Sequence, residues 1–439
     1  MTDESGRWGF MTGLEDSGSG LASGRGRVVG YQRYQFPQED TEQLQPGLFP
    51  SLHGPVEVGN DGLPTGVELE QLVDEEDEAR DAGEISAPFR PENIKIETQT
   101  TTVDLLLSRL REGMIDLAPD FQRRAGIWTD VQQSRLIESL LLRIPISSFH
   151  MAQDEEDNWA VVDGIQRLTA IARFMEPATV GMPPLRLCGL DYLRDFHGDG
   201  YQDLTGRLKI RLRETQLVVH IIQQGTPEAV KFNVFARINT GGMPLKPQEI
   251  RHALIGGPVR GYLADLAEDP AFGEATGNSV SSERMADREM VLRFLAFRLN
   301  DPAEHTQRDF DQFLIGAMHQ VNRLSEERRN EVTVEFQRAM ECAAVIFGGH
   351  AFRKWRGGKA KSPINKALFE AVAVNLATLD DHERERLVAS RDEVLEGFFE
   401  LMGDWDFDRA ISVATGDTKK VRTRFTAMAK LFRGVLDSD

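Results

Sequence analysis

Apolar residues at helical spacing mark two helices where the regular patterning of the chain begins, near residue 94. Leu105, Leu106 and Leu110 fall on one face of a helix that runs to residue 111. Thr102 stands before it, and a threonine hydroxyl can accept a hydrogen bond from the free N–H groups of a first turn. A second apolar stripe over 130–142 predicts another helix, which Thr129 or Asp130 begins.

Shorter apolar runs and a long helical pattern follow. Strands are predicted at 146–151, 159–162 and 216–222, with helices at 167–174, 227–238 and 247–254. From about residue 284 apolar residues recur at three and four positions, which predicts helices at 285–299, 310–324, 326–347, 365–379, 384–402 and 418–435. The fold class is therefore α/β followed by an all-α helical domain. We expect the first domain at 93–260 and the helical domain at 261–439.

The leading segment, residues 1–92, has little periodicity and is strongly acidic. Residues 1–90 hold 18 acidic and 6 basic residues, which leaves 52 acidic and 45 basic residues in the rest of the chain. We expect this segment to be largely disordered, with at most a short helix over 66–79. Two interpretations stay open: a solvated tail, or an acidic arm that covers a basic site or docks a partner.

The composition excludes several classes of protein. No window approaches the roughly 20 apolar residues of a membrane helix, and the N-terminus does not read as a signal peptide. The chain has two cysteines without metal-ligand spacing, which argues against a disulfide framework or a zinc site. We therefore expect a cytoplasmic protein that has no contact with a membrane.

The sequence VVDGIQRLTAI, residues 161–171, changes from strand to helix around four polar or special residues. The first N–H groups of a helix and its dipole favour an anion, and glycine lets the backbone come close to one. Asp163 could ligate Mg²⁺ or orient a water molecule, Gln166 adds hydrogen bonds, and Arg167 could hold a phosphate. Spacing alone favours a blander interpretation, in which Asp163 caps the helix and pairs with Arg167 while Gly164 makes the turn.

Two further polar clusters strengthen the interpretation as a nucleotide site. Gln122 and Arg123 lie in FQRR, just before a predicted helix. A polar, flexible loop lies between two predicted helices and could equally be a helix C-cap and turn. Its residues are Asn239, Thr240, Gly241 and Gly242.

Five motifs in order resemble the N-terminal domain family of GmrSD-type restriction enzymes, a ParB-like domain related to the fold of ParB and sulfiredoxin. They are PDFQRRAGIW (119–128), SLLLRIPI (139–146), VVDGIQRLTAI (161–171), VFARINTGGMPLKPQEIR (234–251) and DREMVLRFLAF (287–297). The resemblance implies a mixed sheet with helices and a setting in phage defence.

The resemblance also implies a site for a nucleoside triphosphate, with Mg²⁺, that supports hydrolysis. Matched by position, Asp163, Gln166 and Arg167 are its catalytic residues, and Asp163 is its metal ligand. The nucleotide-binding residues are Gln122, Arg123, Gly164, Arg167, Asn239, Thr240, Gly241 and Gly242. Ile165 stands where the family motif has a glutamine, and this departure removes one expected polar contact.

A nuclease domain of the His-Asn-His type, which many relatives carry, is not visible in the sequence. Between 340 and 439 the only histidines are His350 and His382, and neither has a suitable neighbour. If DNA is cut, we expect a separate nuclease or defence subunit to cut it.

One basic cluster leaves a DNA-recognition role open. Six residues of this cluster are candidate DNA contacts, because it combines cations with an aromatic ring and lacks acids: Arg353, Lys354, Trp355, Arg356, Lys359 and Lys361. A smaller one follows near the end of the chain, at Lys419, Lys420, Arg422 and Arg424. The alternatives are a solvated surface or a dock for the acidic leading segment.

Overall fold

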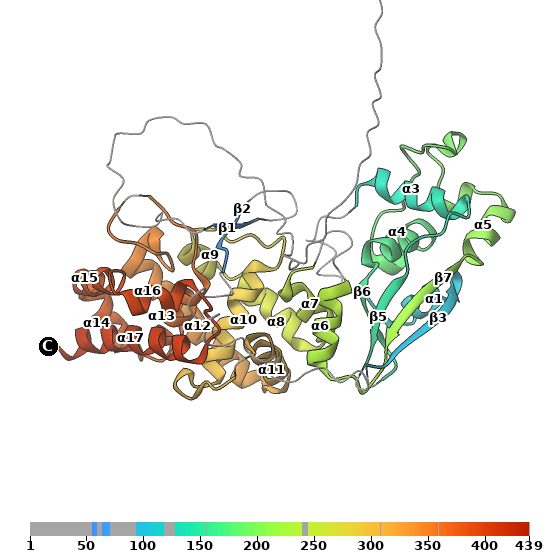
Figure 1. The fold of residues 1–439 in the computed structure, drawn as a ribbon. Coiled ribbons are helices and arrows are strands. Elements are labelled where there is room, and N and C mark those ends of the chain that lie inside the picture. Colours follow the sequence, from blue (N-terminus) through green and yellow to red (C-terminus); the bar gives the residue numbers. More distant parts are fainter. Residues whose placement is uncertain are drawn as a thin grey trace, which may run out of the picture. The chain divides into compact units, whose positions relative to one another are not determined.

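The computed structural model describes residues 55–58, 64–70, 94–117, 128–154, 156–238, 245–307, 309–358 and 360–438. All of them belong to the unit Ser51–Asp439. The elements given below are labelled in Figure 1.

A five-stranded mixed sheet forms the α/β part. Its strand order is β3-β7-β5-β6-β4, with antiparallel pairs β3/β7 and β5/β6 and parallel pairs β5/β7 and β4/β6. The strands are β3 (Ile96–Thr102), β4 (Ile115–Asp116), β5 (Phe149–Gln153), β6 (Trp159–Asp163) and β7 (Gln216–Ile222). The sheet and the helices that follow confirm the predicted fold class.

Four helices share a hydrophobic core with one set of strand side chains. They are α1 (Val103–Arg111), α3 (Asp130–Leu141), α4 (Ile165–Met175) and α5 (Gly206–Arg213). Phe149, Met151 and Val219 from the strands are buried in the same cluster. Because successive strand residues point to opposite faces, the residues between them, such as His150 and His220, lie on the other face of the sheet.

Local capping signals predicted the helix starts correctly. The Thr102 hydroxyl accepts from the Leu105 backbone N–H, and Thr129 forms a capping box with Gln132 at the start of α3. The buried face of α1 differs from the prediction, since Leu107 is buried whereas Leu105 is 52% exposed. A one-residue error in the face arises because three consecutive leucines leave the helical phase open.

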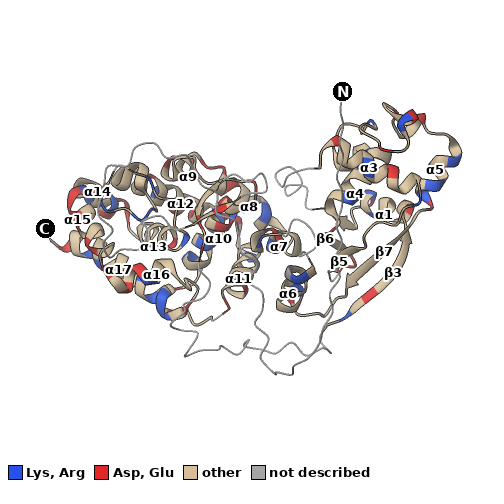
Figure 2. Cartoon of the chain, turned by 45° about the horizontal axis from the view of Figure 1, so that its top comes forward, with Lys and Arg blue, Asp and Glu red and all other residues tan. Residues whose placement is uncertain are grey.

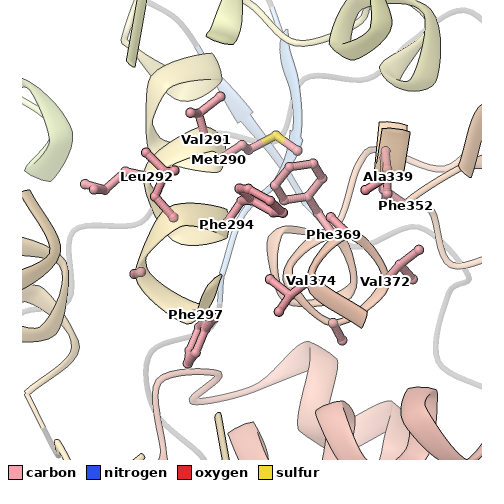
Figure 3. Packing of buried hydrophobic residues seen from close by; sticks show 14 of the residues in the cluster. Met290, Val291, Leu292, Phe294, Phe297, Ala339, Phe352, Phe369, Val372 and Val374 are labelled. Carbon is pink, nitrogen blue, oxygen red and sulfur yellow. The ribbon is translucent and has the colours of Figure 1, made fainter. Parts of the chain in front are cut away.

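The rest of the chain is helical. Its elements are α6 (Glu228–Ile238), α7 (Pro247–Leu254), α8 (Pro258–Ala267), α9 (Pro270–Thr276), α10 (Ala286–Leu299), α11 (Phe310–Arg323), α12 (Glu326–Phe347), α13 (Lys366–Ala377), α14 (Asp381–Ala389), α15 (Arg391–Leu401), α16 (Trp405–Ser412) and α17 (Thr418–Asp437). Helices α10 and α13 lie at its centre, where Met290 and Phe294 face Phe369 (Figure 3). Short 3₁₀ turns occur at Pro177–Val180, Arg194–Phe196, Tyr201–Asp203, Pro302–Glu304 and Gly348–His350.

The predicted single helix over 384–402 is wrong, because the chain forms α14 and α15 there. Ser390 separates the two helices, with ψ of 31° at the start of α15. Asp392 and Glu393 follow in the first turn, where acidic residues favour a new helix N-terminus. A serine followed by acidic residues is typical of a helix N-terminus, and here it interrupts an apolar pattern that otherwise continues from 384 to 402.

Part of the leading segment forms a β-hairpin, which corrects the predicted helix over 66–79 at residues 66–68, while residues 71–79 lie outside the described residues. Strands β1 (Val56–Val58) and β2 (Pro64–Glu68) pair antiparallel, and Val67 is fully buried in the core of the helical part. The Glu68 backbone N–H donates to the Ile364 carbonyl at 2.7 Å, which fixes β2 to the chain before α13. The hairpin therefore belongs to the folded unit.

Acidic side chains anchor this hairpin segment to lysine and arginine side chains of the rest of the chain. Glu70 Oε2 lies 2.5 Å from Arg293 Nη2 of α10, and Glu57 Oε1 lies 3.0 Å from Lys246 Nζ. Glu57 also lies 3.5 Å from Lys366 Nζ of α13. These acidic residues are therefore not part of a solvated tail. They agree with the second interpretation, an acidic arm, and the basic residues that this arm binds belong to the same chain.

Candidate functional site

The turn from β6 to α4 depends on glycine. Gly164 has a φ of +100° and precedes the first residue of α4. A Cβ at this position would lie 2.4 Å from Cδ1 of Phe149, far inside van der Waals contact. Gly164 thus supplies both a conformation that other residues avoid and a close approach of the backbone to the ring.

The N-terminus of α4 supplies the backbone N–H groups of the candidate site. No side chain within the described residues caps it, and the cap residue is Gly164 rather than Asp163. The first N–H groups of a helix have no acceptor inside the helix, so they can bind an anion. The predicted strand-turn-helix geometry is therefore present, although the predicted cap by Asp163 is not.

Arg167 is held by the protein around it. Its Nη2 lies 2.9 Å from Asp163 Oδ2, and its Nη1 donates to the carbonyls of Ser147 and Ser148. The guanidinium also lies 4.8 Å from the ring centre of Phe149, and the side chain is only 12% exposed. Arg167 therefore orients Asp163 and ties the turn before β5 to α4. A contact between Arg167 and a phosphate stays a prediction.

Asp163 remains ionised despite being half-buried. Burial raises the pKa of its carboxyl, but the hydrogen bond with His150 and the charge of Arg167 outweigh that effect and lower the pKa below its usual value. Oδ2 receives both contacts, whereas Oδ1 accepts no hydrogen bond from the described residues. Asp163 therefore presents one carboxylate oxygen to an incoming ligand.

The fit of a magnesium ion to this site depends on the nucleotide. The described residues contain no group of three His, Cys, Asp or Glu side chains placed to hold a metal ion. Mg²⁺ commonly uses one or two carboxylates together with substrate phosphates and water. Asp163 alone fits a metal ion that arrives on a nucleotide, and it does not make a dedicated cage for a free ion.

A β-bulge places Asp163 beside His150. The sequence did not predict a role for His150. Met151 pairs with Val161, but His150 pairs with Asp163, so Val162 is an extra residue in β6. Such a bulge turns the following side chain toward the other face of the sheet. As a result, His150 Nδ1 lies 3.3 Å from Asp163 Oδ2.

The polar row continues across the sheet to β7 and β3. The rings of His150 and His220 stack with centroids 4.9 Å apart, and His220 Nδ1 lies 2.8 Å from the Thr98 hydroxyl. Strand register brings these residues together, since His150 is opposite His220 and Thr98 is opposite His220. The only sequence signal was a histidine at a strand position in each case, which is too weak to identify a site.

Ile165 points away from this polar row. It is 5% exposed and belongs to the core beneath the sheet, together with Leu168 and Ile171 of α4. The replacement of glutamine by isoleucine therefore alters a core position in this fold. It does not remove a side chain from the surface that carries Asp163.

Gln166 connects the turn between β6 and α4 to the chain just before α3. Its Oε1 accepts from the backbone N–H of Trp128 at 3.2 Å, and Trp128 follows the FQRR segment after three intervening residues. Gln122 and Arg123 lie outside the described residues, as do Asn239, Thr240, Gly241 and Gly242. The predicted roles of these six residues, and the catalytic role of Gln166, stay predictions.

Two residues of the first basic cluster, Arg353 and Lys354, bind other residues of the protein. Arg353 is 5% exposed and donates to Ser362 and Ser279, and Lys354 Nζ lies 2.7 Å from Glu68. Arg353 therefore supports packing and has no free face for a phosphate, which corrects its prediction as a DNA contact. Lys354 agrees with the alternative interpretation, because it binds Glu68 of the acidic leading segment.

The other members of that cluster differ in their surroundings. Trp355 stacks on His350 at 4.2 Å and donates to the Gly358 carbonyl. Arg356 and Lys361 are exposed, while Lys359 lies outside the described residues. Their contact with DNA stays a prediction.

The second basic cluster borders a groove. Helices α15 to α17 enclose a volume of about 840 Å³. Its lining includes Lys419, Arg422 and Lys430, with Glu400 and Asp404 also present. Arg424 is excluded from this surface because it is fully buried. Figure 2 shows basic and acidic residues interspersed on α14 and α15.

Comparison with known proteins places one part of the chain in a family. Residues 104–256 match the family described as the GmrSD restriction endonuclease, N-terminal domain. This segment begins in α1, includes strands β4 to β7, and ends just after α7. No curated protein and no solved structure matches the chain. Among the described helices, none combines the length and apolar character needed to cross a membrane.

Proposed function

Because residues 104–256 belong to the GmrSD restriction endonuclease N-terminal domain family, we propose that the protein is a nucleotide-binding regulatory component of a prokaryotic restriction system. The observation that carries the nucleotide part is the uncapped N-terminus of α4 behind Gly164, next to an ionised aspartate. A nucleoside triphosphate matches this combination, since its phosphates suit the N–H groups and its Mg²⁺ suits the carboxylate.

Each residue of the turn has a distinct part in this proposal. The backbone N–H groups at the start of α4 bind a phosphate, and Gly164 provides the left-handed conformation of the turn that leads into the helix. Asp163 would hold the Mg²⁺ that the nucleotide carries, through the carboxylate oxygen that accepts no hydrogen bond from the described residues. Arg167 positions Asp163 through the 2.9 Å ion pair. Binding at this turn would report the nucleotide state to a separate nuclease.

The first test measures binding of ATP, GTP, CTP and UTP by calorimetry, with Mg²⁺ and with EDTA. Asp163→Asn should weaken binding by about 10–100-fold with Mg²⁺ and much less in EDTA, because the lost contact is to the metal. Asp203→Asn is the matched control, since Asp203 is also paired with an arginine, Arg186, at 2.6 Å. If the wild type binds none of the four nucleotides, the proposal is wrong.

A second variant tests the positioning role of Arg167. Arg167→Ala releases Asp163 and the turn at 147–148, so it should weaken nucleotide binding whether or not Mg²⁺ is present. Arg186→Ala removes a comparable but exposed ion pair and should leave binding unchanged. Equal affinities for the two variants would contradict the role of Arg167.

DNA recognition is the second candidate, and the groove on α17 is the observation that favours it. Lys419, Arg422 and Lys430 follow one helix, where they could contact successive phosphates. DNA binding should then fall steeply with salt, and reversal of Lys419 and Lys430 to glutamate should abolish it. Reversal of the exposed Arg356 and Lys361 tests the first cluster without disturbing the buried Arg353. Affinity unchanged by both reversals would exclude both surfaces.

A further inference from the structure

Strand β3 is an edge of the sheet, and half of its backbone groups point away from β7. At the two ends of the β3/β7 ladder, the N–H of Val103 donates to the Thr215 carbonyl, and the N–H of Gln223 donates to the Lys95 carbonyl. Hydrogen-bonded pairs alternate along an antiparallel ladder, so the odd-numbered residues of β3 bond to β7. The even-numbered residues therefore direct their N–H and C=O groups to the open edge.

This open edge is accessible. The outward groups belong to Ile96, Thr98 and Thr100, and all three residues are exposed. Strand β7 is the one neighbour of β3 in the sheet that the described residues form (Figures 1 and 2).

Strand β3 also lacks the features that usually protect an edge. Natural edge strands commonly carry a bulge, a proline or a lysine, each of which hinders pairing with another chain. All seven residues of β3 pair with β7 in one continuous register, and its sequence IETQTTT contains neither proline nor lysine. The edge is therefore suited to accept a further strand.

We propose that the protein forms a homodimer in which β3 pairs antiparallel with β3 of a second copy, around a twofold axis at Thr98. The two five-stranded sheets then form one continuous sheet. A twofold axis makes the contact closed, because each copy uses the same strand. This inference does not depend on the proposed nucleotide site.

The sequence of β3 is complementary to itself in this register. Thr98 lies opposite Thr98 of the second copy, and Ile96 lies opposite Thr100, so every outward N–H and C=O group of the three residues gains a partner. The charged residue of the strand, Glu97, lies opposite Gln99 of the second copy. No like charges face each other directly, which would destabilise the pair.

The adjacent registers are less favourable. Outward groups can bond only to outward groups, so these registers differ by two positions. With Ile96 opposite Thr98, two Glu97 carboxylates would face each other. With Thr98 opposite Thr100, Ile96 would face Thr102, the N-cap of α1, whose carbonyl accepts the first hydrogen bond of that helix.

Side chains on the open face of the sheet favour a second copy over an unrelated strand. Ile96 is 45% exposed, and Val218 of β7 is 43% exposed and lies opposite Thr100. Pairing places Ile96 of the second copy beside Thr100, so apolar side chains flank this threonine on both sides. The polar row of His220 and Thr98 continues into Thr98 of the second copy. Apolar residues therefore meet apolar residues, and polar residues meet polar ones.

The first experiment measures the mass of the full-length protein by size-exclusion chromatography with light scattering. The wild type should have twice the 49.2 kDa of one chain. Thr100→Pro should reduce the mass to that of one chain, because proline removes an outward N–H but no bond to β7. Thr100→Val is the matched control, and it should remain a dimer because it keeps this N–H.

The second experiment tests the register by disulfide cross-linking in a Cys188→Ala background. Thr98→Cys should give a covalent dimer on oxidation, because Cα atoms of a hydrogen-bonded antiparallel pair are about 5.5 Å apart, within the range of a disulfide. Thr100→Cys is the matched control. Its two copies lie four strand positions apart, about 14 Å, so they should not cross-link.

The possible results decide the proposal. A wild type that has the mass of one chain from micromolar to submillimolar concentration would overturn the homodimer. A dimer that persists in Thr100→Pro would mean that another surface holds it. If circular dichroism shows that Thr100→Pro does not fold, Thr98→Lys takes its place, since like charges then face each other across the axis. Thr98→Lys alone should be one chain, and mixing it with Thr98→Glu should restore the dimer; a mixture that stays monomeric would overturn the pairing at Thr98.

Discussion

The glycine between β6 and α4 offers a sharp test of the turn geometry. In Gly164→Ala the new Cβ would meet Phe149 Cδ1 at 2.4 Å, at a backbone φ of +100°. An L-residue in a left-handed conformation costs about 1–2 kcal/mol, and overpacking of a filled site costs about 1–3 kcal/mol. The free energy of unfolding should therefore fall by about 2–5 kcal/mol.

A matched glycine separates the two contributions. Gly181 has a φ of +61°, but nothing lies within 4 Å of the position of its Cβ. Gly181→Ala should therefore cost only the backbone strain, about 1–2 kcal/mol. Urea denaturation followed by circular dichroism measures both variants against the wild type. Equal losses in the two variants would refute the close approach of Gly164 to Phe149.

Three further variants test other parts of the structure by the same urea assay. Ile165→Gln should destabilise the protein by about 2–5 kcal/mol and should not raise nucleotide hydrolysis, since the side chain enters the core; an active and stable variant would contradict this. Burial lowers the pKa of His252 to about 3, so this histidine is neutral in the folded state while the unfolded state gains a proton below about pH 6.5. Stability should fall between pH 6.5 and 3 by up to about 5 kcal/mol, and His252→Leu should lack this part of the acid dependence. Glu370→Gln leaves Arg424 buried without its carboxylate and should cost about 3–5 kcal/mol, whereas a loss below about 1 kcal/mol would contradict the buried pair.

Local signals explain why much of the fold could be predicted. Thr102 and Thr129 begin helices through their own hydroxyl groups, and Pro247 begins α7 as expected of proline in a first turn. The change of apolar spacing at Asp163 located the strand-turn-helix unit. These features depend on neighbours within a few residues, so a single sequence contains them.

Non-local contacts explain what could not be predicted. Glu68 and Glu70 belong to an acidic segment that reads as solvated, yet their partners are Lys354 and Arg293, more than 200 residues away. A charge run does not reveal such partners, because only the folded chain brings them together.

The polar row across the sheet was hidden for the same reason. His150 meets Asp163 only because Val162 is an extra residue in β6. The pattern of apolar residues in VVD gives no sign of this bulge. Likewise, the family motif suggested a polar role at Ile165, but the direction of that side chain follows from helix phase and packing.

Amide hydrogen exchange at the start of α4 tests the central claim most directly. The N–H groups of Ile165 and Arg167 lie in the first turn of α4, where the helix itself offers no acceptor, so they should exchange faster in the free protein than the N–H groups of the following turns. Saturating nucleoside triphosphate with Mg²⁺ should slow exchange in the peptide that contains them. Peptides from the groove on α17 should not change. Protection confined to other elements, or no protection by any nucleotide, would contradict the assignment of this turn as the phosphate site.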